Sequence, residues 1–286
     1  MAAMSDQNVR RDGRRPRGRI TEPMFLALIM GVTLLAVSSA APEQAVDHGL
    51  AFELKRSPAK ANPPLPDTSV YPVQLVLDDD NAEGVFGLAG GQARQFLWFN
   101  RFMNPGPFTL EEIWVLFPGP GDVPVGGNIE LVVYLDPDGN PANGAQLLAS
   151  FAETIQAADN VNFSVYTLPS PVNIADSGDV LIGVVNRYFT TGVTPPPTLP
   201  AALDTTASQD RSYFALWAGD PPSPPDLSSA TAIDVLDGAV SGNFMIRGFG
   251  TDIPQAAVPT LSSWGLVLFC GLVAVAGMYV LRMSFT

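Results

Sequence analysis

Short apolar runs separated by turn-forming residues fill most of the chain from residue 70 onward. The runs are rich in Val, Ile, Phe, Tyr or Trp, and Gly, Pro, Asn or Asp follow them, which is the pattern of strands and turns. No amphipathic helical pattern of ten or more residues lies between residues 70 and 250. The pattern predicts strands at Val73–Leu77, Gln95–Phe102, Phe108–Phe117, Ile129–Leu135, Gln146–Thr154, Asn162–Leu168, Val180–Arg187, Arg211–Trp217 and Asn243–Gly248. Many short strands without crossover helices indicate an all-β fold, an antiparallel β-sandwich of jelly-roll-like type over residues 70–250.

Other patterns divide the rest of the chain. Val180–Val185 is continuously apolar, as expected for a central strand covered on both faces. Two proline-rich segments, Pro195–Pro200 and Pro221–Pro225, predict long loops at the ends of the sandwich. Residues 41–69 combine several prolines with no sustained periodicity, which predicts a Pro-rich linker. Residues 251–257 predict a short linker after the domain.

The N-terminus has the pattern of a secretory signal peptide. Six arginines lie within residues 10–19, an uncharged apolar run covers Met24–Val37, and small residues follow at Ser38–Ala40. This order of a basic, an apolar and a small-residue region predicts a signal peptide over residues 1–40. We expect the apolar region to be helical and signal peptidase to cleave after Ala40 or Ala41. An uncleaved N-terminal anchor is the alternative.

The C-terminal run Trp264–Leu281 carries no charge over 18 residues. A helix of that length spans about 27 Å, close to the hydrocarbon thickness of a bilayer. Trp264 suits a membrane interface at one end of the run, and Arg282 follows at the other end. The run therefore predicts a C-terminal transmembrane helix, with a buried soluble helix as the alternative.

The beginning of this run and the residues before it form a short motif of Val258, Pro259, Thr260, Leu261, Ser262, Trp264 and Gly265. The motif resembles the IPTL-CTERM protein-sorting signal of Gram-negative bacteria, which combines such residues with a transmembrane helix and a basic end. The resemblance covers residues 258–286. It implies export and recognition of the tail in the inner membrane by an exosortase-type sorting enzyme. Only Arg282 stands where the family has a basic cluster, so a permanent anchor is the competing interpretation.

A second resemblance concerns the central domain. Leu77–Gly87, which contains three consecutive aspartates, resembles the opening of jelly-roll accessory domains in bacterial secreted proteins. It implies the sandwich fold and carries no implication of an activity.

Charge and composition exclude several classes of function. Residues 41–258 hold 8 basic and 25 acidic residues, and such an acidic domain repels phosphate backbones, which excludes nucleic acid as a partner. Cys270 is the sole cysteine and lies in the tail, so the domain has no disulfide. His48 is the sole histidine and lies in the predicted linker, which excludes zinc sites built on His and Cys and disfavours a Ser-His-Asp triad.

One loop has the spacing of a calcium site. Asp136, Asp138 and Asn140 occur at i, i+2 and i+4, where short oxygen-bearing side chains can converge on one cation. Pro141 and Leu147 stand where an EF-hand has its glycine and its bidentate acid, so the loop is not an EF-hand. The competing interpretation is a hairpin loop whose residues serve turn geometry.

A second acidic group consists of Asp78, Asp79, Asp80 and Glu83. Neighbouring residues of a strand point to opposite faces, so the four can converge only in a loop. The group predicts either a structural calcium site at the edge of the sandwich or a solvated acidic turn.

Side chains on and beside the predicted strands suggest two further functions, sugar binding and glycoside hydrolysis. Trp98 and Phe99 are adjacent, so they face opposite sides and one could be exposed for sugar stacking; Tyr188 is the other candidate. Glu130 and Glu153 could approach across strands, and a retaining glycosidase needs its two carboxyl groups about 5 Å apart. No nucleophile motif such as G-x-S-x-G is present, which disfavours a secreted hydrolase.

The sequence therefore predicts an exported protein of the cell envelope or outer surface, structural or adhesive in role and not an enzyme. Its expected partners are the membrane through the C-terminal helix, signal peptidase and an exosortase-type enzyme. The alternative is a carbohydrate- or calcium-binding β-sandwich module, for which extracellular polysaccharide would be the partner and calcium the cofactor.

Overall fold

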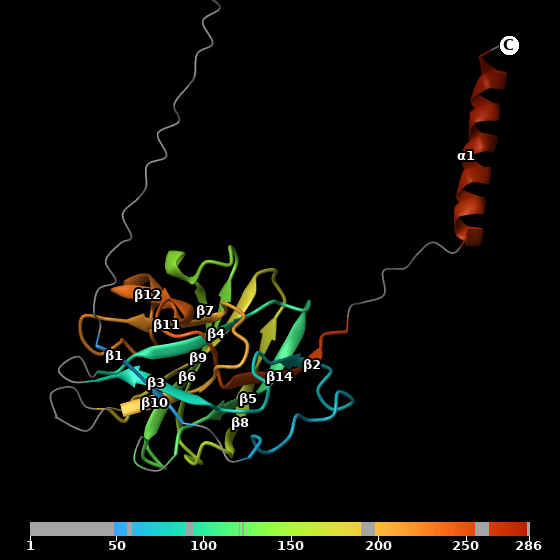
Figure 1. Cartoon of the computed structure of the whole chain (residues 1–286). Coiled ribbons are helices and arrows are strands. Elements are labelled where there is room, and N and C mark those ends of the chain that lie inside the picture. Colours follow the sequence, from blue (N-terminus) through green and yellow to red (C-terminus); the bar gives the residue numbers. More distant parts are fainter. Residues whose placement is uncertain are drawn as a thin grey trace, which may run out of the picture. The chain divides into compact units, whose positions relative to one another are not determined.

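A computed structural model describes residues 49–55, 59–89, 94–119, 121, 123–189, 198–254 and 263–284. The described chain is mostly β-structure, and the strand pairings of its three sheets are antiparallel (Figure 1). The largest sheet has six strands in the order β12 (Ala232–Val235), β11 (Ser212–Leu216), β4 (Leu97–Phe102), β9 (Asp179–Val185), β6 (Asn128–Asp136) and β7 (Gln146–Thr154).

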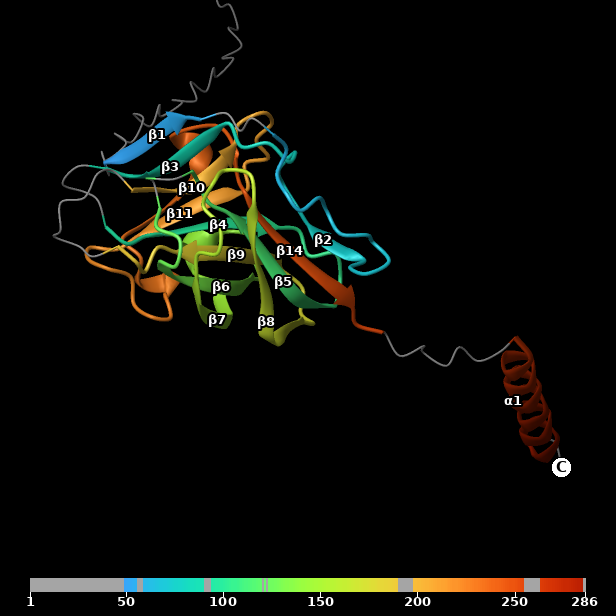
Figure 2. The same cartoon turned by 90° about the horizontal axis from the view of Figure 1, so that it is seen from below.

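Two four-stranded sheets supply the remaining strands. Figure 2 shows one of them, in the order β2 (Val73–Leu75), β14 (Ile246–Asp252), β5 (Phe108–Leu116) and β8 (Phe163–Ile174). The other has the order β1 (Leu50–Leu54), β3 (Gly84–Leu88), β10 (Thr198–Asp204) and β13 (Asn243–Phe244). From β4 to β6, and from β7 to β9, the chain passes from the large sheet to a small one and back, since β5 and β8 belong to the sheet of β2 and β14. The prediction of an all-β domain with antiparallel sheets is therefore confirmed.

The main core lies between the six-stranded sheet and the two smaller sheets. Trp98 and Ile182 of the large sheet are buried in one cluster with Ile113 of β5 and Phe86 of β3. The layers approach closely at Gly248 of β14, where an added Cβ would lie 2.6 Å from Cδ1 of Ile182. Alternating apolar positions on facing strands thus meet in one continuous core, which is the source of stability expected for a domain without disulfides.

The six-stranded sheet is also covered on its other face. Phe99 and Leu181 point there and are buried in a second cluster with Tyr134, Trp217 and Leu227. The hydroxyl of Tyr134 donates to the carbonyl oxygen of residue 225 at 2.7 Å, which ties the proline-rich loop to the sheet. Burial on both faces explains the continuous apolar run of β9 and confirms that this strand is central.

All nine predicted strands coincide with observed strands, while β1, β3, β10 and β12 were not predicted. Strand β1 lies inside residues 41–69, the range predicted as a linker, and pairs with β3 over five residues. Strand β10 begins at Thr198, inside the predicted loop Pro195–Pro200, and pairs with β3 and β13. The pairing partners of these two strands lie far away in the sequence, where a local pattern does not detect them. Nearby prolines favour a loop in the sequence pattern, which hides the strand.

The C-terminal helix α1 spans Ser263–Met283, with Arg282 in its last turn. Large apolar side chains along it are exposed, including Val267, Leu272 and Val280. Within the described ranges, no helix is both long and apolar enough to cross a membrane. The helical conformation of the tail is confirmed, and its membrane span stays a prediction.

Candidate functional site

Asp136 is the last residue of β6 and lies buried at the start of the predicted calcium loop. The side chain is 0% exposed, and within the described chain neither of its carboxylate oxygens has a hydrogen-bond partner. Burial raises the pKa of Asp136, and the neighbouring carboxylate of Asp138 raises it further. The structure therefore brings Asp136 and Asp138 together, as the spacing predicted.

The other two polar residues of this loop hold its shape. The carboxylate of Asp138 accepts hydrogen bonds from the Asn140 amide and from Nδ2 of Asn143, both at 3.0 Å, and these bonds lower its pKa. The side-chain oxygen of Asn140 accepts from the amide of Ala142 at 3.3 Å and caps a short 3₁₀ helix, Pro141–Asn143. Asn140 thus serves the turn geometry named as the competing interpretation.

Basic residues stand near this loop but are engaged elsewhere. Asp179 lies directly opposite Asp136 in the β6–β9 register. Both Arg101 and Arg211 form ion pairs with Asp179 at 3.4 Å, and Arg101 also donates to the carbonyl oxygen of Gly139. Their charges are therefore directed at Asp179 and at the loop backbone.

The second acidic group splits into two sets. Asp78 and Asp80 bind the guanidinium of Arg247, which is fully buried and lies 4.4 Å from the ring centre of Phe163. Asp79 and Glu83 turn instead toward Asp204 at the end of β10, and one oxygen of each of these three lies within 4.8 Å of the others. Asp204 was missed in the sequence because it lies over 120 residues away and no local signal points to it.

Backbone amides already engage this second cluster. Asp204 accepts from the amides of Asp79 and Thr206 at 3.1 and 2.8 Å, and Glu83 accepts from the amide of Thr205 at 2.9 Å. Burial raises the pKa of Asp204. These bonds fasten the loop before β3 to the end of β10, so the cluster already has a structural role.

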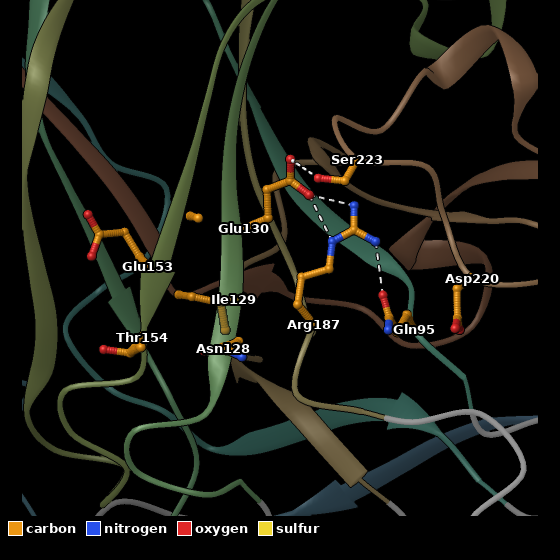
Figure 3. A pocket seen from close by; sticks show the side chains of 10 residues that line it. Gln95, Asn128, Ile129, Glu130, Glu153, Thr154, Arg187, Asp220 and Ser223 are labelled. Atoms are coloured by element: carbon orange, nitrogen blue, oxygen red, sulfur yellow. Dashed lines mark hydrogen bonds and ion pairs between the residues drawn. The ribbon is translucent and has the colours of Figure 1, made fainter.

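A pocket of about 680 Å³ lies where β6 begins and β7 ends (Figure 3). Glu130 there accepts from Nε of Arg187 at 2.8 Å and from the hydroxyl of Ser223 at 3.1 Å. Arg187 also donates to Oε1 of Gln95 and to the carbonyl oxygen of Pro221, at 2.9 and 2.7 Å. The charge of Glu130 is therefore neutralised by a bidentate partner.

The two glutamates considered as a hydrolase pair lie on opposite faces of the sheet. Glu153 pairs with Ile129 and Glu130 pairs with Ala152, so adjacent positions carry the two carboxylates. Figure 3 shows Glu130 and Glu153 pointing away from each other. The approach of these two side chains, on which the hydrolase alternative depended, does not occur because side chains alternate across a strand.

The aromatic residues considered for sugar stacking are not exposed. Trp98 packs in the main core and Phe99 in the second cluster, since both faces of the sheet are covered. Tyr188 is half-buried and packs against the main core. Phe52 of β1, at 41%, is the one aromatic side chain classed as exposed in the described β-domain. The expectation that one of Trp98 and Phe99 is exposed was wrong.

Several predicted residues lie outside the described part of the chain. These are the cleavage positions Ala40 and Ala41, with the signal peptide, and the sorting residues Val258, Pro259, Thr260, Leu261 and Ser262. The last two sorting residues, Trp264 and Gly265, lie in the first turns of α1.

The fold thus defines an all-β antiparallel domain followed by a C-terminal helix. Comparison of the sequence with family models shows that residues 256–283 match the IPTL-CTERM motif. The chain therefore carries this C-terminal sorting motif, which confirms the resemblance of its tail, and the motif indicates export to the cell envelope. No curated protein matches the chain significantly.

Two solved structures show limited similarity. One is the crystal structure of the cysteine protease and lectin-like domains of Cwp84, a surface layer associated protein of Clostridium difficile, with 15% identity and a TM-score of 0.38. The match covers 63% of this chain and 36% of that chain. The other is clostridial Cwp84 after propeptide cleavage, with 16% identity, a TM-score of 0.34, and 56% and 37% of the two chains covered. The chain spans little more than a third of the length of either structure.

Proposed function

We propose that this chain is an exported protein of the cell envelope or outer surface, with a structural or adhesive role and no enzymatic one. The single observation that carries the proposal is the match of residues 256–283 to the IPTL-CTERM motif. In this proposal the β-sandwich is the cargo, and the tail directs it to an exosortase-type sorting enzyme.

The composition of the tail supports a membrane-bound step before sorting. Helix α1 carries exposed Val, Leu and Phe side chains along its length, and Arg282 follows the apolar run. Such a surface is unfavourable in water and favourable in hydrocarbon. We therefore propose that α1 holds the protein in the inner membrane until the tail is processed.

The sites described above favour a role without catalysis. Glu130 is neutralised by Arg187, and Glu153 lies on the opposite face of the sheet. Trp98, Phe99 and Tyr188 pack against the core, so the proposal does not include sugar stacking on these side chains.

Mass spectrometry of the protein from inner-membrane, outer-membrane and secreted fractions tests the proposal. We expect the mature N-terminus at Ala41 or Pro42, and loss of the tail in the fractions beyond the inner membrane. Pro259→Ala and Trp264→Ala should leave the tail attached and the protein in the inner membrane. Gln255→Ala, just before the matched residues, is the control and should behave as the wild type. An intact N-terminus in the cytosol, or motif variants distributed as the wild type, would contradict the proposal.

A further inference from the structure

The buried carboxylate of Asp136 lacks a compensating charge. It is 0% exposed, and neither oxygen is hydrogen-bonded within the described residues. An ionised carboxylate loses its hydration on burial, and this loss must be offset by a proton, a hydrogen-bond donor or a cation. Within the described residues, the fold buries Asp136 and gives neither of its oxygens a hydrogen-bond donor.

Other acidic groups near Asp136 increase its need for a compensating positive charge. Asp138 places a second carboxylate beside it, and Asp179 stands opposite it in the register. Arg101 and Arg211 are the basic side chains near this end of the sheet, and both are paired with Asp179. The negative charge of Asp136 and Asp138 is therefore not neutralised by these arginines.

The backbone around the pair is closely packed. Gly178 lies against Asp136, where an added Cβ would come within 2.7 Å of its carbonyl oxygen, and Gly178 has a φ of +135°. This packing holds the end of β6 in place on its inner side. On the outer side, Asp138 and Asn140 are exposed, so the carboxylate pair borders on solvent.

We propose that Asp136 and Asp138 bind one divalent cation of the calcium class at the end of β6. Calcium prefers carboxylate oxygens and takes six to eight oxygen ligands, several of which can be water. Asp136 would supply a buried anchor and Asp138 the solvent-facing ligand. Water would fill the remaining positions, since the Asn140 oxygen caps the 3₁₀ helix. This site goes beyond the sorting function and does not depend on it.

The main competitor is a proton shared between the two carboxylates. It would relieve the same repulsion by placing the proton on Asp136, while Asp138 keeps the donors from Asn140 and Asn143. The two explanations differ in whether calcium changes the stability of the protein.

Thermal melts of the full chain, solubilised in detergent, test the proposal when the melting temperature in calcium is compared with that in chelator. For free calcium about 100 times above its Kd, we expect the melting temperature to rise by about 5 to 10 °C. Asp136→Asn and Asp138→Asn should each abolish the rise. Because Asp138 is exposed, its variant should fold even where the variant of a buried residue fails. Calcium titration by calorimetry should give one site per chain in the wild type.

Two variants control for other acidic groups. Asp252→Asn removes one exposed carboxylate at the end of β14, and Asp79→Asn removes an exposed member of the second cluster. Both should keep the full calcium-dependent rise. Equal melting in calcium and chelator would favour the shared proton and overturn the proposal. A rise that survives Asp138→Asn, or that Asp79→Asn abolishes, would place the cation elsewhere and overturn it as well.

Discussion

At the scale of single residues, Arg247 connects segments that are distant in the sequence. It lies on β14, is fully buried, and binds Asp78 and Asp80 in the loop before β3. Its guanidinium also lies over the ring of Phe163. A buried ion pair adds little over an apolar replacement, but removing one partner leaves a buried charge uncompensated.

We expect Arg247→Met to destabilise the protein strongly. The carboxylate of Asp78 is fully buried and would lose its partner, which costs about 3–5 kcal/mol in the free energy of unfolding. Urea denaturation measures the change. Lys55→Met breaks the solvent-accessible pair with Glu53, in which Lys55 is partly and Glu53 largely exposed, and should change the free energy of unfolding by less than about 1 kcal/mol. Equal effects of the two variants would show that Arg247 contributes no more than a surface charge.

Asp136 and Asn140 show how far a spacing motif predicts a site. The i, i+2, i+4 pattern correctly brings Asp136 and Asp138 together, because successive loop residues stay close whatever the fold. It could not tell that Asn140 caps a 3₁₀ helix, since that depends on the local backbone conformation. It could also not tell that Asp136 is buried without a partner, since distant strands create that environment.

At the scale of elements, β9 shows why a central strand needs a glycine. It pairs with β4 on one side and β6 on the other, and both of its faces are covered. At Gly183 an added Cβ would lie 2.6 Å from Cβ of Phe99 and 2.8 Å from Cδ1 of Leu97. Because Gly183 has no side chain, Phe99 and Leu97 can pack directly against β9.

We expect Gly183→Ala to destabilise the domain by about 1–3 kcal/mol, because the added methyl overpacks a well-filled core. Gly219→Ala is the matched control, since an added Cβ there meets nothing within 4 Å. Guanidinium denaturation of both variants measures the difference. An unchanged denaturation midpoint for Gly183→Ala would mean that the packing around β9 rearranges to accommodate the added methyl group.

The strands that the sequence pattern missed share a physical cause. β1 carries exposed residues and β12 is partly buried, so neither presents a strong apolar run. β10 begins beside several prolines that resemble a loop. β1 and β10 pair with strands that lie far away in the sequence, β12 pairs with the preceding strand β11, and none of these partners is visible in a local sequence window.

At the scale of the whole molecule, the chain combines an all-β antiparallel domain with a tail that carries the IPTL-CTERM motif. The IPTL-CTERM match ends at residue 283 and begins after the last strand, β14, so cargo and signal do not overlap. This separation in sequence indicates that the signal can act independently of the domain before it.

Transfer of the tail to another protein tests this independence. We expect an exported reporter fused to residues 256–286 to be held in the inner membrane and then to lose its tail, as proposed for the native protein. The same fusion with Trp264→Ala is the control and should stay unprocessed. Western blots of cell fractions follow both. If the fused reporter were neither held in the inner membrane nor processed, the β-domain would have to take part in sorting.

The sequence by itself determined the all-β class, nine of the strands, the loop at Asp136 and the sorting motif. These are local properties, since periodicity, turn chemistry and a contiguous motif act within a few residues. Only the tertiary structure decided that Asp204 meets Asp79, that Glu130 and Glu153 face apart, and that Trp98 and Phe99 are both buried. Strand pairing and the covering of each sheet face decide these features, and they bring together residues such as Asp79 and Asp204, which the chain separates by 125 positions.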